Sequence, residues 1–230
     1  MKKRESIRSL KKSAKQILKS SCDYGKLLDL SEDSELRVIN ILFSFLYHKN
    51  PVIKWNAVTA MGSAVSDLAE KEIEQARNII RRLMWNLNDE SGGIGWGSAE
   101  AMGEILAESE NLAKEYGPIL FSYARQEANF QEHELMQRGV LWGIGRFCQM
   151  PSGIPEGTAK DIVPFLKSED AYVRGHAAWV MGLIKAEDSE FLLEELKKDE
   201  TVITVFINTK LTDIRVKDLA EDALFRIKKE

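Results

Sequence analysis

The segment Ile53-Lys-Trp-Asn-Ala-Val-Thr-Ala-Met-Gly62 carries the pattern that decides the fold. Similar segments recur along the chain, and three of them also end in glycine: Ile94–Gly103, Met136–Gly145 and Val173–Gly182. The closing glycines are 41, 42 and 37 residues apart, and a fifth copy follows 43 residues later with Phe225 in the glycine position. Apolar residues within each copy recur at helical spacing. The chain is therefore predicted to be an array of about five helical repeats.

A second helical stretch precedes each copy, so each repeat is predicted to be a pair of helices. A period near 40 residues with this pattern is typical of HEAT and armadillo arrays, which form right-handed α-α superhelices. We expect one all-α domain over residues 1–230, with repeats at about 36–66, 71–108, 112–148, 158–186 and 188–228. Asn50 followed by Pro51 is a typical helix start, and Thr158 with Asp161 resembles a capping box.

The fourth repeat carries a family resemblance. The stretch Leu166-Lys-Ser-Glu-Asp-Ala-Tyr-Val-Arg-Gly-His-Ala-Ala-Trp-Val-Met-Gly-Leu-Ile-Lys185 is similar to the HEAT-like repeats of phycocyanobilin lyases, and Lys54 and Arg174 match the basic position of that motif. The stretch Asp89-Glu-Ser-Gly-Gly-Ile-Gly-Trp-Gly97 resembles that of an uncharacterised HEAT-like family of anaerobic bacteria. These resemblances imply a fold, and they imply no particular activity.

Two stretches interrupt the helical pattern. The segment 149–158 is rich in proline and glycine, and we interpret it as a loop because the repeat period continues across it. The segment 201–215 is rich in β-branched residues that alternate with polar ones. It predicts a small hairpin with strands at Val202–Phe206 and Leu211–Arg215.

Composition and charge exclude several classes of protein. Hydrophobic residues make up 44% and charged residues 30%, which is typical of a folded globular chain. The net charge is −4, which argues against a non-specific nucleic-acid binder. The two cysteines are far apart, no stretch is long and apolar enough to span a membrane, and no signal peptide is recognisable. We therefore expect a cytoplasmic protein.

The first twenty residues have a different charge from the rest. They contain eight Lys or Arg and one acid, a net charge of +7, so the remaining 210 residues carry −11. Ile7, Leu10, Ala14 and Leu18 recur at helical spacing, which predicts a basic amphipathic helix. This helix either docks its apolar face on the body as a terminal cap, or forms an arm for a membrane or a nucleic acid.

The candidate binding residues lie on one face of the second helices. At 100° per residue, Trp55, Trp96, Trp142 and Trp179 fall opposite the predicted core face, which includes Ala57 and Met61. In solenoids this face lines the concave side. The predicted groove comprises these four tryptophans with Glu100, Arg138 and His176. Exposed tryptophans are typical of binding hot spots, but the same rings could instead pack between helices.

No complete catalytic constellation is present in the sequence. Gly92–Gly97 is a glycine-rich helix start without the features of a P-loop, and Cys148 is predicted to be a buried apolar residue. Trp96, Glu100, Arg138 and Trp179 together resemble the site of alkylpurine DNA glycosylases built from HEAT-like repeats, but this chain is acidic where those enzymes are basic. A tetrapyrrole (bilin) lyase is a further alternative by analogy of fold.

We therefore predict a non-enzymatic binding or adaptor module. It would bind a protein segment or a small ligand in the tryptophan-lined groove, and we expect no nucleic acid, cofactor or metal. Glu100 and Arg138 lie on successive repeats at nearby levels of the predicted groove. We expect them to pair, or to bind the same polar group of a ligand, because half-buried charges are costly unless matched.

Overall fold

The computed structural model describes residues 6–30, 35–89, 95–150 and 153–229. The chain has two compact units, residues 1–112 and 113–230, and each is described here by itself. Both are built of helical pairs, and a small two-stranded sheet belongs to the second. The predicted all-α repeat fold with a hairpin is confirmed, while the prediction of one domain over the whole chain stays a prediction. None of the described helices is long and apolar enough to span a membrane.

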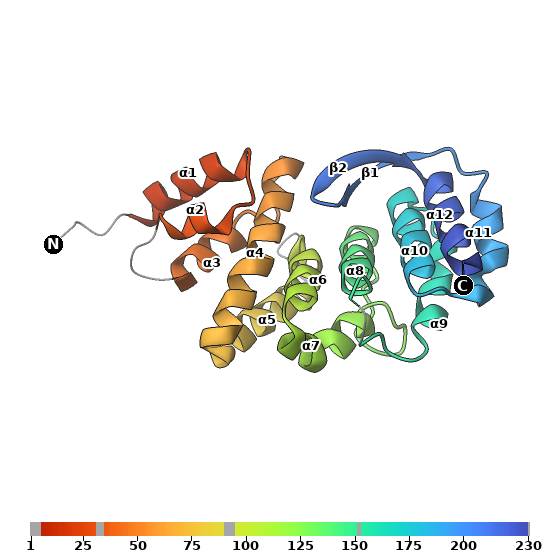
Figure 1. The fold of residues 1–230 in the computed structure, drawn as a ribbon, viewed down its shortest axis with the longest axis horizontal. Coiled ribbons are helices and arrows are strands. Elements are labelled where there is room, and N and C mark those ends of the chain that lie inside the picture. Colours follow the sequence, from red (N-terminus) through yellow and green to blue (C-terminus); the bar gives the residue numbers. More distant parts are fainter. Residues whose placement is uncertain (1–5, 31–34, 90–94, 151–152, 230) are drawn as a thin grey trace. The chain divides into compact units, whose positions relative to one another are not determined.

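In its described residues the N-terminal unit has six α-helices and the start of a seventh (Figure 1). The six are α1 (Ile7–Leu18), α2 (Tyr24–Leu28), α3 (Glu35–Phe43), α4 (Pro51–Lys71), α5 (Ile73–Leu87) and α6 (Ser98–Glu108). α4 packs against α3, α5 and α6. The predicted start of α4 is confirmed, because the Asn50 side chain accepts a hydrogen bond from the Ile53 backbone at 3.2 Å and Pro51 opens the helix.

Helix α1 docks on this unit by its apolar face. Leu10, Ala14 and Leu18 are buried, and α1 contacts α3 and α4. Ile7, which we assigned to the same face, is exposed because it lies in the first turn, beyond the packed part of the helix. In the structure, α1 therefore docks on α3 and α4 as a terminal cap.

The C-terminal unit continues the pairs with α7 (Glu110–Ser122), α8 (Glu134–Phe147), α9 (Thr158–Ile162) with the 3-10 helix η2 (Val163–Lys167), and α10 (Ala171–Leu183). It ends with η3 (Glu187–Ser189), α11 (Glu190–Leu196), strands β1 (Val202–Ile207) and β2 (Lys210–Arg215), and α12 (Val216–Lys228). The boundary between the units falls inside α7. α10 packs between α8 and α12.

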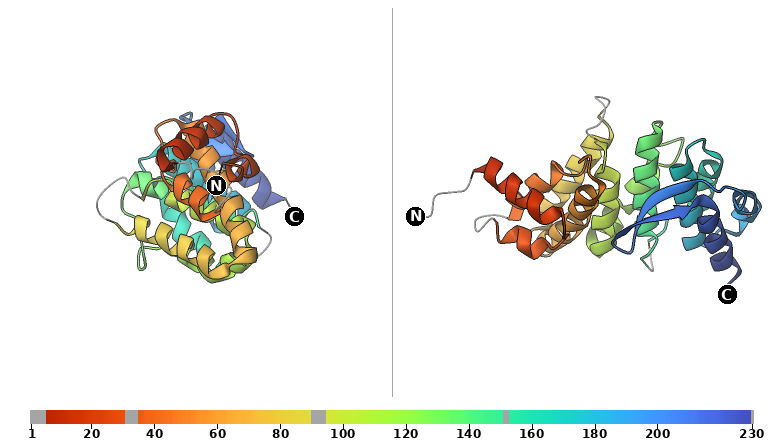
Figure 2. Two further views of the ribbon diagram at one scale, coloured as in Figure 1. Left: turned by 90° about the vertical axis from the view of Figure 1, so that its left-hand side faces the viewer. Right: turned by 90° about the horizontal axis from the view of Figure 1, so that it is seen from above.

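The hairpin forms where the alternation predicts it, one residue longer in each strand. β1 and β2 are antiparallel, with Val202 opposite Arg215 and Ile207 opposite Lys210. β1 contacts α10 and β2 contacts α12, so the hairpin lies against the helices of its unit (Figure 2). The expected capping box at Thr158 is wrong, because Gly157 is the N-cap of α9 and Asp161 instead pairs with Arg125 at 2.9 Å.

The closing glycines of the repeats are contact points for the next helix of the same unit. A Cβ at Gly145 would lie 2.3 Å from the Trp179 ring, and one at Gly182 would lie 2.6 Å from the Ala223 Cα. Both positions therefore have no room for a side chain. Phe225, at the corresponding place in α12, is exposed, because no later helix of the described chain packs there.

Candidate functional site

A surface cavity of about 600 Å³ lies in the N-terminal unit, where the ends of α3 and α5 meet the start of α6. We call it the Trp96 cavity. Its apolar wall includes Phe43, Leu46, Tyr47 and Trp96, and its polar wall is formed by Asn40, Ser44, Lys49, Arg82, Asn86 and Ser98. Its volume is within the range of ligand-binding pockets. Trp96 is 45% exposed and Tyr47 is 51% exposed, so the aromatic rim is open to solvent.

Gly97 fixes the position of Trp96 at this rim. Its φ of +82° is a conformation that residues with a side chain rarely adopt, and a Cβ there would lie 2.2 Å from the Leu46 carbonyl oxygen. The backbone can therefore pass close to the end of α3 only with glycine at 97. This explains part of the glycine-rich segment in structural terms. Gly92, Gly93 and Ile94 lie outside the described residues.

Arg82 is held in a defined orientation in the cavity wall. Its guanidinium carbon lies 3.8 Å from the centroid of the Phe43 ring, and Nη1 donates a hydrogen bond to the Asn40 side chain at 2.6 Å. Stacking and one hydrogen bond leave further N–H donors of the guanidinium for a ligand. Such an orientation suits a carboxylate, which arginine can bind with two parallel hydrogen bonds.

The charge of the cavity is positive in a chain that is acidic overall. Arg82 and Lys49 both line it, and none of the described residues that line it is Asp or Glu. Within the described residues neither cation forms an ion pair with a carboxylate. The cavity thus combines an exposed aromatic rim with two cations whose charge is not neutralised by a described acid.

Of the predicted groove residues in this unit, Trp96 lines the cavity, whereas Trp55 and Glu100 belong to a separate contact. The Lys54 ammonium forms an ion pair with Glu100 at 2.6 Å and lies 5.0 Å from the centroid of the Trp55 ring. Glu100 is buried and Trp55 is half-buried. This pair ties α4 to α6, so Glu100 already has a partner within its own unit.

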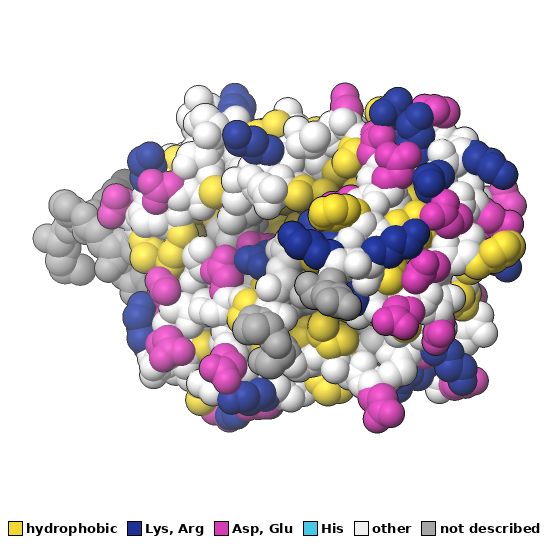
Figure 3. All heavy atoms as spheres, turned by 45° about the vertical axis from the view of Figure 1, so that its right-hand side comes forward, with side chains coloured by type: hydrophobic (Ala, Val, Ile, Leu, Met, Phe, Trp, Pro, Cys, Tyr) yellow, Lys and Arg dark blue, Asp and Glu magenta, His cyan; other side chains and the backbone are white. Residues whose placement is uncertain are grey.

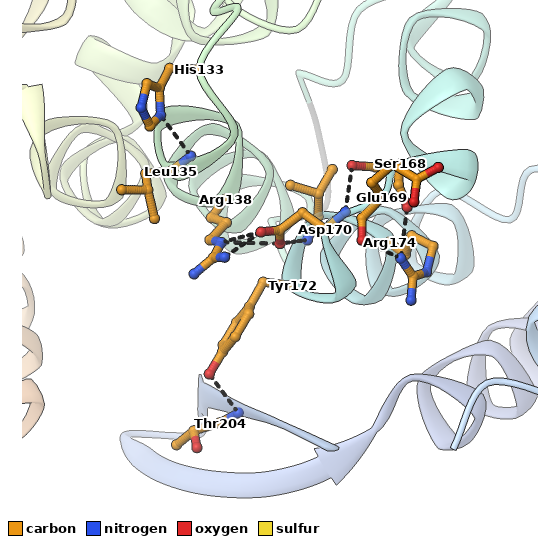
Figure 4. A network of polar contacts seen from close by, with 10 residues as sticks. His133, Leu135, Arg138, Ser168, Glu169, Asp170, Tyr172, Arg174 and Thr204 are labelled. Atoms are coloured by element: carbon orange, nitrogen blue, oxygen red, sulfur yellow. Dashed lines mark hydrogen bonds and ion pairs between the residues drawn. The ribbon is translucent and has the colours of Figure 1, made fainter. Parts of the chain in front are cut away.

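Arg138 also has a partner within its own unit (Figure 4). Its Nε lies 3.0 Å from both carboxylate oxygens of Asp170, a second contact runs from Nη2, and the guanidinium lies 4.5 Å from the centroid of the Tyr172 ring. Asp170 is also the N-cap of α10 and accepts a hydrogen bond from the Val173 backbone at 3.1 Å. The structure thus gives Glu100 and Arg138 separate partners, each within its own unit. The mutual pair that we expected would join the two units and stays a prediction.

The surroundings of Asp170 lower its pKa. Burial alone would raise the pKa of this carboxyl, but the hydrogen bonds from Arg138 and from the Val173 N–H outweigh burial and favour the ionised form. The opposite holds for Cys148, where burial raises the pKa of the thiol to about 12. The Cys148 side chain is therefore a buried thiol and not an activated nucleophile, in agreement with its predicted role.

The remaining predicted groove residues are buried in the C-terminal unit. Trp142 is 2% exposed, and its indole N–H donates to the Phe206 carbonyl of β1 at 2.7 Å. Trp179 is 7% exposed because its ring packs on Gly145, and His176 is buried beside Tyr172. We predicted that Trp142, Trp179 and His176 line a groove, which requires exposed side chains, but all three are buried. A binding role for these residues stays a prediction that no observation tests.

The hairpin covers Trp142, whereas the Trp179 ring packs on Gly145. β1 has two anchors on the helices. Phe206 O accepts a hydrogen bond from the Trp142 indole, and Thr204 N donates to the Tyr172 hydroxyl at 3.4 Å (Figure 4). Ile203 fills the space above Gly175. The predicted hairpin is confirmed, whereas the groove role of this helix face stays a prediction. The sequence contains no local signal that the hairpin covers Trp142.

Several residues of the Trp96 cavity were missed in the sequence. Tyr47, Lys49 and Arg82 lie at or near the ends of the first helices, outside the repeated pattern from which the groove was derived. An available signal was Tyr47-His-Lys-Asn50, an aromatic and basic turn at the end of a helix. The described residues contain no group of three or more His, Cys, Asp or Glu side chains that could hold a metal ion.

Comparisons with known proteins identify the class to which the fold belongs. No family model matches the chain. An uncharacterized protein of Archaeoglobus fulgidus is 26% identical over 191 residues, which is 79% of this chain and 94% of that protein. A designed armadillo repeat protein, solved in complex with the peptide (KR)4, is similar with a TM-score of 0.58 at 17% identity, covering 96% of this chain and 91% of that one. A structural genomics engineered protein gives 0.57 at 17% identity, covering 96% and 90%. The fold is therefore of the armadillo and HEAT-like repeat class.

Proposed function

We propose that the chain is a non-enzymatic binding module that takes up a segment of another protein at the Trp96 cavity. The observation that carries the proposal is the cavity itself, with an exposed tryptophan and tyrosine at its rim and two cations in its wall. Tryptophan, tyrosine and arginine are the residues most enriched at binding hot spots.

A protein segment suits this cavity better than a small ligand. Small molecules are bound in pockets that bury most of their surface, whereas here Trp96, Tyr47 and Lys49 are all exposed. A peptide can place one side chain in the cavity and continue across the rim. The cations favour a segment with Asp or Glu beside an aromatic or apolar residue. The designed armadillo neighbour was solved with a basic peptide, (KR)4, so the charge preference proposed here is the opposite.

The test is a selection of displayed random dodecapeptides against the whole chain, followed by titration calorimetry with an enriched peptide. We expect acidic and aromatic sequences to be enriched. Trp96→Ala should weaken binding by about thirtyfold, the effect of losing a hot spot of about 2 kcal/mol, and Tyr47→Ala should also weaken it. Both side chains are about half exposed, so thermal unfolding should change little.

Trp85→Ala is the matched control. Trp85 is 72% exposed on α5, in the same unit, but does not line the cavity. Its loss should change the affinity by less than about twofold. The proposed function would be contradicted if no peptide were enriched or if Trp96→Ala bound the peptide as tightly as the wild type. It would also be contradicted if Trp85→Ala lost as much affinity as Trp96→Ala.

The enzymatic alternatives have less support. The carboxylate that a glycosylase would need is Glu100, which is buried and engaged by Lys54. Glu100→Gln with a base-release assay on alkylated DNA would test that alternative directly. A tetrapyrrole lyase stays an analogy of fold.

A further inference from the structure

Helix α1 carries a stripe of five cations, which we call the α1 stripe: Arg8, Lys11, Lys12, Lys15 and Lys19. At 100° per residue these positions fall within an arc of about 100° on the side away from Leu10 and Ala14, over a length of about 17 Å. All five residues are exposed, while Leu10, Ala14 and Leu18 are buried in the unit. Packing therefore holds the stripe outward on a fixed support.

The α1 stripe is not an ordinary solvated surface, because its charges repel one another. Five pairs of like charges lie three or four residues apart along it, an arrangement that destabilises a helix. Within the described residues none of the five side chains forms an ion pair with a carboxylate. Some exposed cations on other helices pair with a carboxylate one turn away, as Lys197 does with Glu194 and Arg226 with Asp222.

The stripe also differs from the face of the molecule that Figure 3 draws. On the face drawn in Figure 3, basic and acidic side chains are interspersed and do not gather into a patch of one sign. The chain beyond residue 20 carries a net charge of −11. A self-repelling row of cations on one helix of such a chain fits a partner that supplies the missing negative charge.

We propose that the α1 stripe binds the surface of an anionic phospholipid membrane, independently of the function proposed for the Trp96 cavity. Four of its five cations are lysines, which act as point charges toward headgroup phosphates and carboxylates. The arc contains no Asn or Gln and only one arginine to read bases, which favours a lipid surface over a nucleic acid.

Vesicle co-sedimentation of the whole chain tests this inference. At about 50 mM NaCl we expect the chain to sediment with phosphatidylcholine vesicles that contain about 30% phosphatidylserine. It should be released from them at about 300 mM NaCl, and it should not sediment with vesicles of pure phosphatidylcholine. Replacing the five cations by glutamine should lower the partition coefficient by at least tenfold, since each contributes up to about fivefold near an anionic leaflet. This variant should melt no lower than the wild type, because the repulsion along α1 is removed.

A control variant with the same net charge separates location from total charge. It replaces five exposed lysines of the C-terminal unit by glutamine: Lys160, Lys167, Lys185, Lys198 and Lys210. It should sediment as the wild type does. The proposal would be overturned if the wild type did not bind the anionic vesicles, or if both variants lost the same share of vesicle binding. Binding to a DNA duplex without binding to vesicles would also overturn it.

Discussion

Arg82 and Arg81 are neighbours on α5 with different surroundings. Arg82 is stacked on Phe43 and bonded to Asn40 in the wall of the Trp96 cavity. Arg81 points elsewhere, hydrogen-bonds to Asn78 and lies 3.9 Å from a Glu74 oxygen. The two side chains carry the same charge on adjacent residues, so comparing them separates recognition at the cavity from a general effect of charge.

We predict that Arg82→Gln weakens the binding of an acidic peptide by about tenfold or more, because a hydrogen bond to a charged group contributes about 1.5–3 kcal/mol. The affinity should also depend less on salt, since one cation is removed from the contact. Titration of the enriched peptide at two ionic strengths measures both effects. Arg81→Gln should leave the affinity within about twofold. Equal effects of the two substitutions would show that the cavity makes no specific contact with a carboxylate.

At the level of elements, a basic residue near the start of a second helix binds a carboxylate of the next repeat. Lys54 of α4 binds Glu100 of α6, Arg138 of α8 binds Asp170 at the start of α10, and Arg174 of α10 binds Asp199 ahead of β1. The acids are largely buried in each case. These pairs fix the register of successive helical pairs within each unit.

We predict that Asp170→Asn lowers the stability of the C-terminal unit by about 1–2 kcal/mol at neutral pH, because asparagine keeps the helix cap but loses the charge that binds Arg138. The folded-state pKa of Asp170 is lowered, so its stabilising contribution is complete above the unfolded pKa of about 4 and is lost as pH falls through the folded pKa. Thermal unfolding from pH 7 to pH 3 should therefore show the difference from wild type shrinking below about pH 4.

Asp222→Asn is the control for this prediction. Asp222 pairs with Arg226 on the same helix, and both side chains are nearly half exposed. Its loss should change stability by less than about 0.5 kcal/mol. A difference for Asp170→Asn that persists unchanged at pH 3 would assign its effect to packing or capping and not to the ion pair.

The sequence predicted the helices and the hairpin better than it predicted which side chains are exposed. Helical periodicity located the pairs, and alternation located the hairpin, because both signals are local. The burial of Trp142 depends on β1, which lies more than 60 residues further along the chain, so no local pattern encodes it. The Trp96 cavity likewise brings together Asn40, Arg82 and Trp96 from three separate elements. Most of its residues, among them Asn40 and Arg82, fall outside the repeated motif on which the predicted groove was based, and Trp96 is the groove residue that the motif located.

At the scale of the whole molecule, the chain has two compact units. In a repeat array each repeat packs only on its neighbours. A substitution that disturbs the packing at one point should therefore lower the stability mainly of the adjacent helices. Gly145 is a suitable place to introduce one. It lies on α8 against the Trp179 ring of α10, well inside the C-terminal unit.

We predict that Gly145→Ala destabilises the C-terminal unit by about 1–3 kcal/mol, because the new methyl group overlaps the Trp179 ring. Without that overlap alanine would stabilise a helix by about 1 kcal/mol, so the sign of the change tests the close approach. Hydrogen exchange should then accelerate in α8 and α10, while the amides of α4 in the other unit keep their protection. Combining Gly145→Ala with Trp179→Leu should cost less than the sum of the two single changes, since the smaller side chain relieves the overlap. Faster exchange in α4 as well would mean that the two units unfold together, which nearest-neighbour packing does not predict.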